Sequence, residues 1–213
     1  MNKTVDLVTR WTGFEEKFPG ASIEDFCRKQ LSQSKENKHP EKLFEGKTTA
    51  PREDIILLKL LGRITWYQSF YTEIAMEGLE IKRVEEFYFL NYIRQVGNPI
   101  KTEVIYQYVH TFSTGLYILD GLIQKGYIKE TGASKDKRSK RVSITAKGQK
   151  VLAKSYERFA PVVQLLTFDL PLEDIKLCIQ LLGSIDTKFD PLWKKHRGKS
   201  LSKIYEQITG KSL

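Results

Sequence analysis

The stretch "GLIQKGYIKETGASKDKRSKRVSITAKGQKVL", residues 121–152, holds the pattern that decides the fold. Its segments "YIKET" and "RVSIT" alternate between apolar and polar residues, as half-buried β-strands do. The residues between these segments include several Lys and Arg, so the sequence predicts a β-hairpin with a basic tip. Gly126 is typical of a helix end and Thr145 of an N-cap, so one helix is expected before the hairpin and another after it.

Two short helices are predicted upstream of the hairpin, over residues 101–109 and 113–125, with the turn "HTF" between them. The second carries apolar residues that are expected to face inward, namely Leu116, Leu119, Leu122 and Ile123. Helix, turn, helix, hairpin and helix is the order of a winged helix-turn-helix, so the expected fold class is mainly α with a small β-hairpin wing. In such a module the second helix enters the major groove of a duplex, and the hairpin lies beside it. The expected partner is therefore double-stranded DNA.

The positive charge of the chain is local. The formal net charge is +9, but residues 125–158 alone hold eleven Lys and Arg against three acidic residues, and residues 188–213 hold seven against two. A basic loop and a basic tail on an otherwise balanced chain favour a polyanionic partner. From the charge alone, a solvated charged face explains the pattern equally well.

Long helices are predicted on both sides of this module. Residues 51–81 and the segment after Pro171 carry broad apolar stripes, and a helix over about residues 84–96 ends at Gly97-Asn98-Pro99. These helices present more apolar face than a small winged module covers. The surplus predicts a homodimer that is joined through about residues 52–81 and 172–195.

The first fifty residues are predicted to be a helical extension. An amphipathic stripe stops at Pro19-Gly20, and it consists of Leu7, Trp11, Phe14 and Phe18. Ser22 is the expected N-cap of a second helix, which would bury Ile23, Phe26, Cys27 and Leu31. The predicted organisation is an extension and linker over residues 1–50, a dimerisation helix over 51–83, the winged module over 84–146, and dimerisation helices with a basic tail over 147–213.

Three motifs follow one another in the order of a known family. They are a "LxxKGxIxR" helix end at Leu122 to Lys129, a "DxRxxR" wing at Asp136, Arg138 and Arg141, and an "xLTxxG" segment at Ile144, Thr145 and Gly148. This combination resembles the MarR family of bacterial transcription regulators over about residues 55–192. The resemblance implies a homodimer that presents two winged modules to a pseudo-palindromic operator. It also implies a pocket for aromatic ligands between the dimer helices and the DNA-binding module.

The predicted site residues fall into three groups. DNA contacts are expected from Thr111, Ser113, Thr114, Tyr117, Lys135, Lys137, Arg138, Lys140 and Arg141, and Asp136 is expected to brace the wing. A ligand pocket would be lined by Trp66, Tyr67, Phe70, Tyr71 and Tyr88, for which an ordinary aromatic core is the favoured alternative. Gly115 lies inside the second helix of the pair, where glycine is unfavourable. Close packing of this helix against the preceding one would explain a glycine at this position.

Other classes of function have little support in the sequence. The three histidines have no partners at metal-ligand spacing, and no nucleophile motif or phosphate-binding glycine loop is present, so neither an enzyme nor a cofactor is expected. Cys27 and Cys178 are expected to be buried, and the cytoplasm is the expected compartment. The competing interpretation is a winged-helix module that binds a protein or RNA partner through its basic face.

Overall fold

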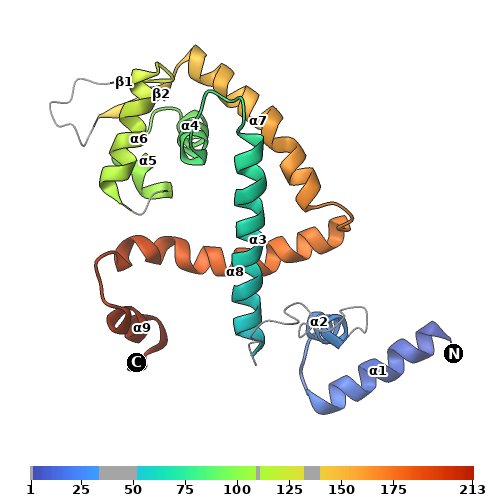
Figure 1. The fold of residues 1–213 in the computed structure, drawn as a ribbon. Helices are drawn as coiled ribbons and strands as arrows, with labels where there is room; N and C mark the ends of the chain where they lie inside the picture. Colours follow the sequence, from blue (N-terminus) through green and yellow to red (C-terminus); the bar gives the residue numbers. More distant parts are fainter. Residues whose placement is uncertain (1, 34–51, 109–110, 132–139) are drawn as a thin grey trace, which may run out of the picture. The chain divides into compact units, whose positions relative to one another are not determined.

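The computed structural model describes residues 2–33, 52–108, 111–131 and 140–213, which form two compact units, residues 1–64 and 65–213. The first unit contains α1 (Lys3–Lys17), α2 (Ile23–Gln33) and the start of α3 (Glu53–Ala75). The second contains the end of α3 and then α4 (Val84–Val96), α5 (Lys101–Tyr108), α6 (Phe112–Gln124), β1 (Ile128–Thr131), β2 (Arg141–Ile144), α7 (Ala146–Leu166), α8 (Leu172–His196) and α9 (Leu201–Thr209). Figure 1 shows these elements, and they confirm the predicted class, mainly α with a small β-hairpin.

In the first unit, α1 and α2 meet through aromatic side chains. The ring of Phe26 lies 5.2 Å from that of Trp11 and 5.5 Å from that of Phe14, centroid to centroid. As predicted, Ser22 is the N-cap of α2, because its hydroxyl accepts a hydrogen bond from the backbone N–H of Asp25. The Asp25 carboxylate accepts from the backbone N–H of Ser22 in return.

The predicted buried face of α2 is wrong except at Phe26. Phe26 is buried, whereas Ile23, Cys27 and Leu31 are exposed. In the part of this unit that the structure describes, the aromatic contact with α1 involves Phe26 alone from α2.

In the second unit, α4 is the centre of the winged module and packs against α5, α6, α7 and β2 (Figure 1). Its side chains Phe89, Leu90 and Ile93 are fully buried. The core around them includes side chains from each neighbouring element, among them Val104, Ile105, Leu119, Leu122, Val142 and Leu152. The helix-turn-helix pair and the hairpin thus share one core with the helix that precedes them.

The hairpin is anchored by a segment that the sequence did not predict to take part in the sheet. β1 and β2 pair antiparallel, with Ile128 opposite Ile144. The residues just before α5 run along the other edge of β2, where the N–H of Val142 donates to the carbonyl of Pro99 and the N–H of Lys101 donates to that of Lys140. The base of the wing is therefore hydrogen-bonded on both edges of β2.

One helix boundary in this unit differs from the prediction, and one helix was not predicted. Helix α3 ends at Ala75 rather than near residue 81, and the chain then turns through Gly78, which has a φ of 77°. The Arg158 guanidinium from α7 donates hydrogen bonds to the carbonyls of Ala75 and Glu77, which closes this helix end. Helix α9 lies in the segment that the sequence indicated only as a basic tail.

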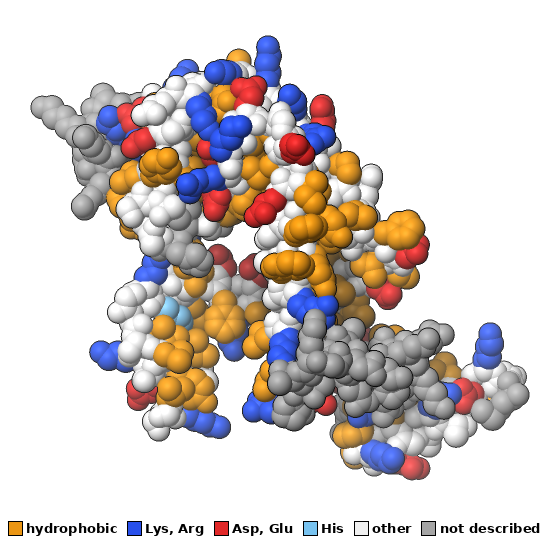
Figure 2. Space-filling model, viewed as in Figure 1, with side chains coloured by type: hydrophobic (Ala, Val, Ile, Leu, Met, Phe, Trp, Pro, Cys, Tyr) orange, Lys and Arg blue, Asp and Glu red, His pale blue; other side chains and the backbone are white. Residues whose placement is uncertain are grey.

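Large apolar side chains are exposed along the long helices, and Figure 2 shows hydrophobic side chains uncovered on the visible face. On α8 they include Leu172, Ile179, Leu181, Leu182, Ile185 and Phe189, and on α3 they include Leu57, Leu58, Ile64, Trp66, Phe70 and Ile74. Cys178 of α8 is exposed as well, so the prediction that both cysteines are buried is wrong for the single chain. Within the described residues, no helix combines the length and the apolar character that crossing a membrane requires.

The close approach of α5 and α6 yields a first prediction. A Cβ atom at Gly115 would lie 2.5 Å from Cγ2 of Ile105, whereas one at Gly121 in the same helix would meet no atom within 4 Å. We expect Gly115→Ala to lower the free energy of unfolding by roughly 1–3 kcal/mol, because the two helices must move apart. Gly121→Ala should raise it by up to about 1 kcal/mol, because alanine favours a helix. Urea denaturation of both variants measures the difference, and equal effects would contradict close packing as the reason for Gly115.

Candidate nucleic-acid interface

Helix α6 presents the predicted DNA-contacting residues on one exposed face. Gly115, Ile118, Leu119 and Leu122 are buried on its inner side. A helical period of 3.6 residues turns the other positions outward. The exposed side chains at the start of α6 and on its outer side are Thr111, Ser113, Thr114 and Tyr117. Tyr117 is the most prominent, with 69% of its surface exposed.

The start of α6 is suited to an anion. The Thr111 hydroxyl lies 2.6 Å from the Thr114 hydroxyl and makes no side-chain capping bond to a backbone N–H. The first-turn N–H groups of α6 therefore have no side-chain cap from Thr111. Such groups carry the positive end of the helix dipole, which attracts phosphate oxygens.

Arg83 is a candidate contact that the sequence analysis missed. This residue precedes α4, and its guanidinium carbon lies 5.7 Å from the centre of the Tyr117 ring. The geometry is that of a cation–π pair, and it brings a positive charge beside the outer face of α6. No sequence signal connects two residues that are this far apart in the chain.

The predicted wing residues divide into two groups. Lys135, Asp136, Lys137 and Arg138 lie outside the residues that the structure describes, so their predicted roles stay predictions. Lys140 and Arg141 lie at the base of the wing and both have partners within the chain. The Lys140 ammonium lies 2.6 Å from a carboxylate oxygen of Glu130, and the Arg141 guanidinium donates to the carbonyl of Asn98 at 2.7 Å.

Glu130 connects two lysines at this base. One carboxylate oxygen lies 2.5 Å from the ammonium of Lys101, and the other binds Lys140. Hydrogen bonds from Lys101 and then from Lys140 hold the pKa of the Glu130 carboxyl below its ordinary value. The carboxylate therefore stays ionised, and both ion pairs persist at neutral pH.

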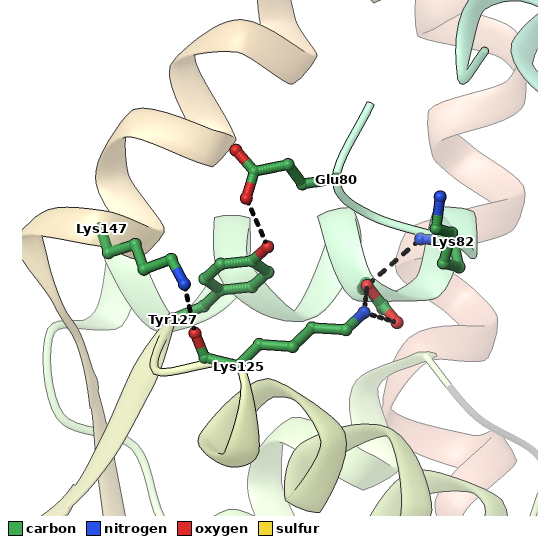
Figure 3. A network of polar contacts seen from close by, with 6 residues as sticks. Glu80, Lys82, Lys125, Tyr127 and Lys147 are labelled. Carbon is green, nitrogen blue, oxygen red and sulfur yellow. Dashed lines mark hydrogen bonds and ion pairs between the residues drawn. The ribbon is translucent and has the colours of Figure 1, made fainter. Parts of the chain in front are cut away.

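A second polar network fixes the other end of α6 (Figure 3). The Lys125 ammonium, just after α6, donates to both carboxylate oxygens of Glu86 at 2.8 Å, and the N–H of Lys82 lies 3.3 Å from one of them. The Lys147 ammonium donates to the carbonyl of Lys125. These contacts join the end of α6 to the start of α4 and to the start of α7.

Tyr127 belongs to the same network. Its hydroxyl donates to Glu80 at 2.8 Å, as Figure 3 shows, and its ring is almost fully buried. Burial and the hydrogen bond to Glu80 raise the pKa of Tyr127 to about 12. The segment between α3 and α4 is thereby attached to the strand that follows α6.

One of the predicted ligand-pocket residues, Tyr88, lines a groove of the described structure. A groove of about 380 Å³ lies between the end of α3 and the start of α4, with Tyr88 in its wall together with Thr65, Gln68, Ser69, Thr72, Glu73, Met76, Lys82, Arg83, Val84 and Glu85. Trp66 and Phe70 are instead exposed on α3, where their rings stack on each other. Tyr67 and Tyr71 make edge contacts with this pair. Among the described residues, no group of His, Cys, Asp and Glu is arranged to hold a metal ion.

Comparisons with known proteins agree with this geometry. Residues 84–148 match a family model described as a winged helix DNA-binding domain. A mutant of MarR from E. coli, solved in complex with operator DNA, is similar in structure with a TM-score of 0.56 and 20% identity over 65% of this chain and 99% of that one. A MarR family regulator from Silicibacter pomeroyi gives 0.52 and 17% over 62% of this chain and 87% of that one. Comparison with curated sequences finds no match. The chain thus carries a winged helix DNA-binding domain, and the resemblance to MarR regulators is confirmed in the fold.

The network around Tyr127 yields a second prediction. We expect Tyr127→Phe to lower the free energy of unfolding at neutral pH by about 0.5–1.5 kcal/mol, because the hydrogen bond to Glu80 is lost. Folding raises the pKa of Tyr127 from 10.0 to about 12. The contribution of the neutral Tyr127 side chain to the free energy of unfolding should therefore be lost as the pH rises from 10 toward 12. Urea denaturation from pH 8 to pH 11 should therefore show the two proteins converging. A difference that does not narrow with pH would contradict the assignment.

Proposed function

We propose that this chain is a transcription regulator that binds double-stranded DNA sequence-specifically, as a homodimer, through α6 and the wing. The observation that carries the proposal is the outer face of α6, where Thr111, Ser113, Thr114 and Tyr117 are exposed within a winged helix DNA-binding domain. Side chains of this kind bind base edges and phosphates in a major groove. The wing residues Lys135, Lys137 and Arg138 would add phosphate and minor-groove contacts.

The local charge supports a duplex rather than a neutral partner. Of the eleven Lys and Arg of residues 125–158, Lys125 caps the end of α6 and the other ten belong to β1, the wing, β2 and α7, so all of them follow α6 directly. Arg83 adds a further positive charge beside Tyr117. A protein with this distribution releases counterions when it meets DNA, so its affinity should fall steeply with salt.

Exposed apolar side chains support the homodimer. Ile179, Leu182 and Ile185 of α8 recur at helical spacing and are uncovered in the single chain, as are Trp66 and Phe70 of α3. These exposed faces lie on α3 and α8, the two helices through which the sequence predicts a dimer. A second copy of the chain is therefore the partner that would cover them. An obligate interface has the apolar character of such faces.

We also propose that a small aromatic acid modulates DNA binding from the groove beside Tyr88. Its volume of about 380 Å³ suits a ligand of that size, and Lys82 and Arg83 in its wall offer positive charge to a carboxylate. Arg83 also lies over the Tyr117 ring. A ligand that binds Arg83 would therefore change the outer face of α6.

The DNA-binding proposal is tested at Tyr117. On a duplex selected from a random pool, we expect Tyr117→Ala to weaken binding about 10- to 100-fold, because a contact on the recognition helix is lost. Gln164→Ala, at an exposed position near the end of α7, is the control and should bind like the wild type. Fluorescence anisotropy over a range of salt concentrations measures both. A wild-type protein that binds no duplex, but captures RNA or a protein through its basic face, would establish the alternative function.

The homodimer is tested at Ile179, which is 66% exposed in the single chain and can be changed without disturbing its core. We expect Ile179→Glu to shift the protein from dimer to monomer, because a charge would be buried in the interface. Gln180→Glu adds the same charge at the next exposed position and should leave the dimer intact. Sedimentation velocity at micromolar concentration distinguishes the two. A monomeric wild-type protein under these conditions would exclude the homodimer.

A further inference from the structure

Lys101 is a buried cation in a position that a helix does not favour. It is the first residue of α5, and its side chain is only 8% exposed. A positive charge at a helix N-terminus is unfavourable because it meets the positive end of the helix dipole. Removing an ammonium group from water adds a further cost. Contacts elsewhere must therefore hold this side chain in place.

These contacts come from both DNA-facing parts of the module. The Lys101 ammonium lies 2.5 Å from a carboxylate oxygen of Glu130 on β1 and 3.6 Å from one of Asp120 on α6. Its backbone N–H donates to the carbonyl of Lys140, the residue just before β2. One residue of α5 thus contacts α6, β1 and the segment that leads into β2.

The contact on α6 lies close to the surface that would read DNA. Asp120 follows Tyr117 by three residues, so the two side chains lie on neighbouring turns of the same helix face. Asp120 is exposed, whereas the lysine that it contacts is buried. The ion pair therefore connects the outer face of α6 with the interior of the wing base.

Packing of apolar side chains does not fill the space between α6 and the wing base. Among the described residues, a cavity of about 530 Å³ opens there, and its wall consists of Lys101, Thr102, Phe112, Leu116, Asp120, Glu130 and Lys140. Where side chains interdigitate, they fix the separation of two elements. At this place, outside the core that α6 and the wing share around α4, the ion pairs of Lys101 cross the gap instead.

We propose that Lys101 is the positioning residue that sets the wing relative to the recognition helix, so that both reach one duplex. This proposal rests on the proposed DNA-binding function. Lys101 acts through Asp120 and Glu130 and does not touch the nucleic acid. A lysine that neutralises a phosphate contributes to the salt dependence of binding, whereas a positioning lysine changes the affinity and leaves the slope unaltered.

The test compares Lys101→Met with Lys3→Met, which removes the same charge from the exposed first residue of α1, outside both basic segments. Anisotropy titrations on the selected duplex at several salt concentrations give affinity and slope. We expect Lys101→Met to weaken binding by about ten-fold or more with an unchanged salt slope, because the wing and α6 lose their common anchor. Lys3→Met should stay within about three-fold of the wild type, as an exposed charge outside the DNA-binding module does.

A second variant guards against misfolding. Asp120→Asn removes the α6 contact but leaves Lys101 paired with Glu130, so no buried charge loses its last partner. We expect it to weaken binding about three- to five-fold. The double variant Lys101→Met/Asp120→Asn should bind no more weakly than Lys101→Met alone, because both changes interrupt one contact. Circular dichroism melts define a temperature at which every variant is folded.

The outcomes separate this role from the proposed function. A wild-type protein that binds no duplex would refute DNA binding itself. Wild-type binding that Lys101→Met and Asp120→Asn leave unchanged would refute only the positioning role. A weakened Lys101→Met with a flatter salt slope would show that Lys101 meets a phosphate, which also overturns the role.

Discussion

Burial of helix α4 is the constraint on which the winged module depends. Phe89, Leu90 and Ile93 have no exposed surface, and each neighbouring element buries its own apolar side chains against this helix. Because α5, α6, β2 and α7 all pack on the same helix, their mutual angles are set by side-chain shape at one centre. Because the inner face of α6 packs in the core around α4, its opposite face is left exposed.

Electrostatic contacts then secure the C-terminal half of α6 at two places. Lys125 and Glu86 attach its C-terminal end to the start of α4, while Asp120 reaches Lys101 at the base of the wing. In each pair one partner is shielded from water, Glu86 in the first and Lys101 in the second, so salt screens these contacts less than a pair of two exposed side chains. A protein whose partner is a polyanion benefits from internal ion pairs of this kind, since its affinity for that partner changes with salt much more than its own geometry does.

The fold could be predicted from the sequence where local chemistry was decisive. Helix α4 begins and ends as its apolar spacing and Gly97 indicated, and Thr145 caps α7 by accepting from the N–H of Gly148. The inward-facing residues Leu119 and Leu122 of α6 also followed from the periodicity of the sequence. The approach of α5 to α6 at Gly115 was also anticipated, because a glycine inside a helix needs a reason.

What could not be predicted depends on contacts between distant residues. The pairing of Pro99 and Lys101 with the second strand has no alternating pattern, and a lysine gives no sequence signal that its ammonium will be buried. Arg83 reaches Tyr117 only after α4 and α6 have packed together. The cysteines were expected to be buried on the basis of residue type, but Cys178 lies on a helix face that nothing else in the described chain covers.

The hydrogen bonds of Arg158 bear on where the autonomous folding unit ends. The matched winged helix domain stops at residue 148, yet the carbonyls of Ala75 and Glu77 are satisfied by Arg158, and Val151 and Leu152 complete the core. A fragment cut at the limits of the matched domain would expose that core and lose the helix before it. The unit that folds cooperatively therefore extends beyond the matched domain at both ends, into the end of α3 and the start of α7.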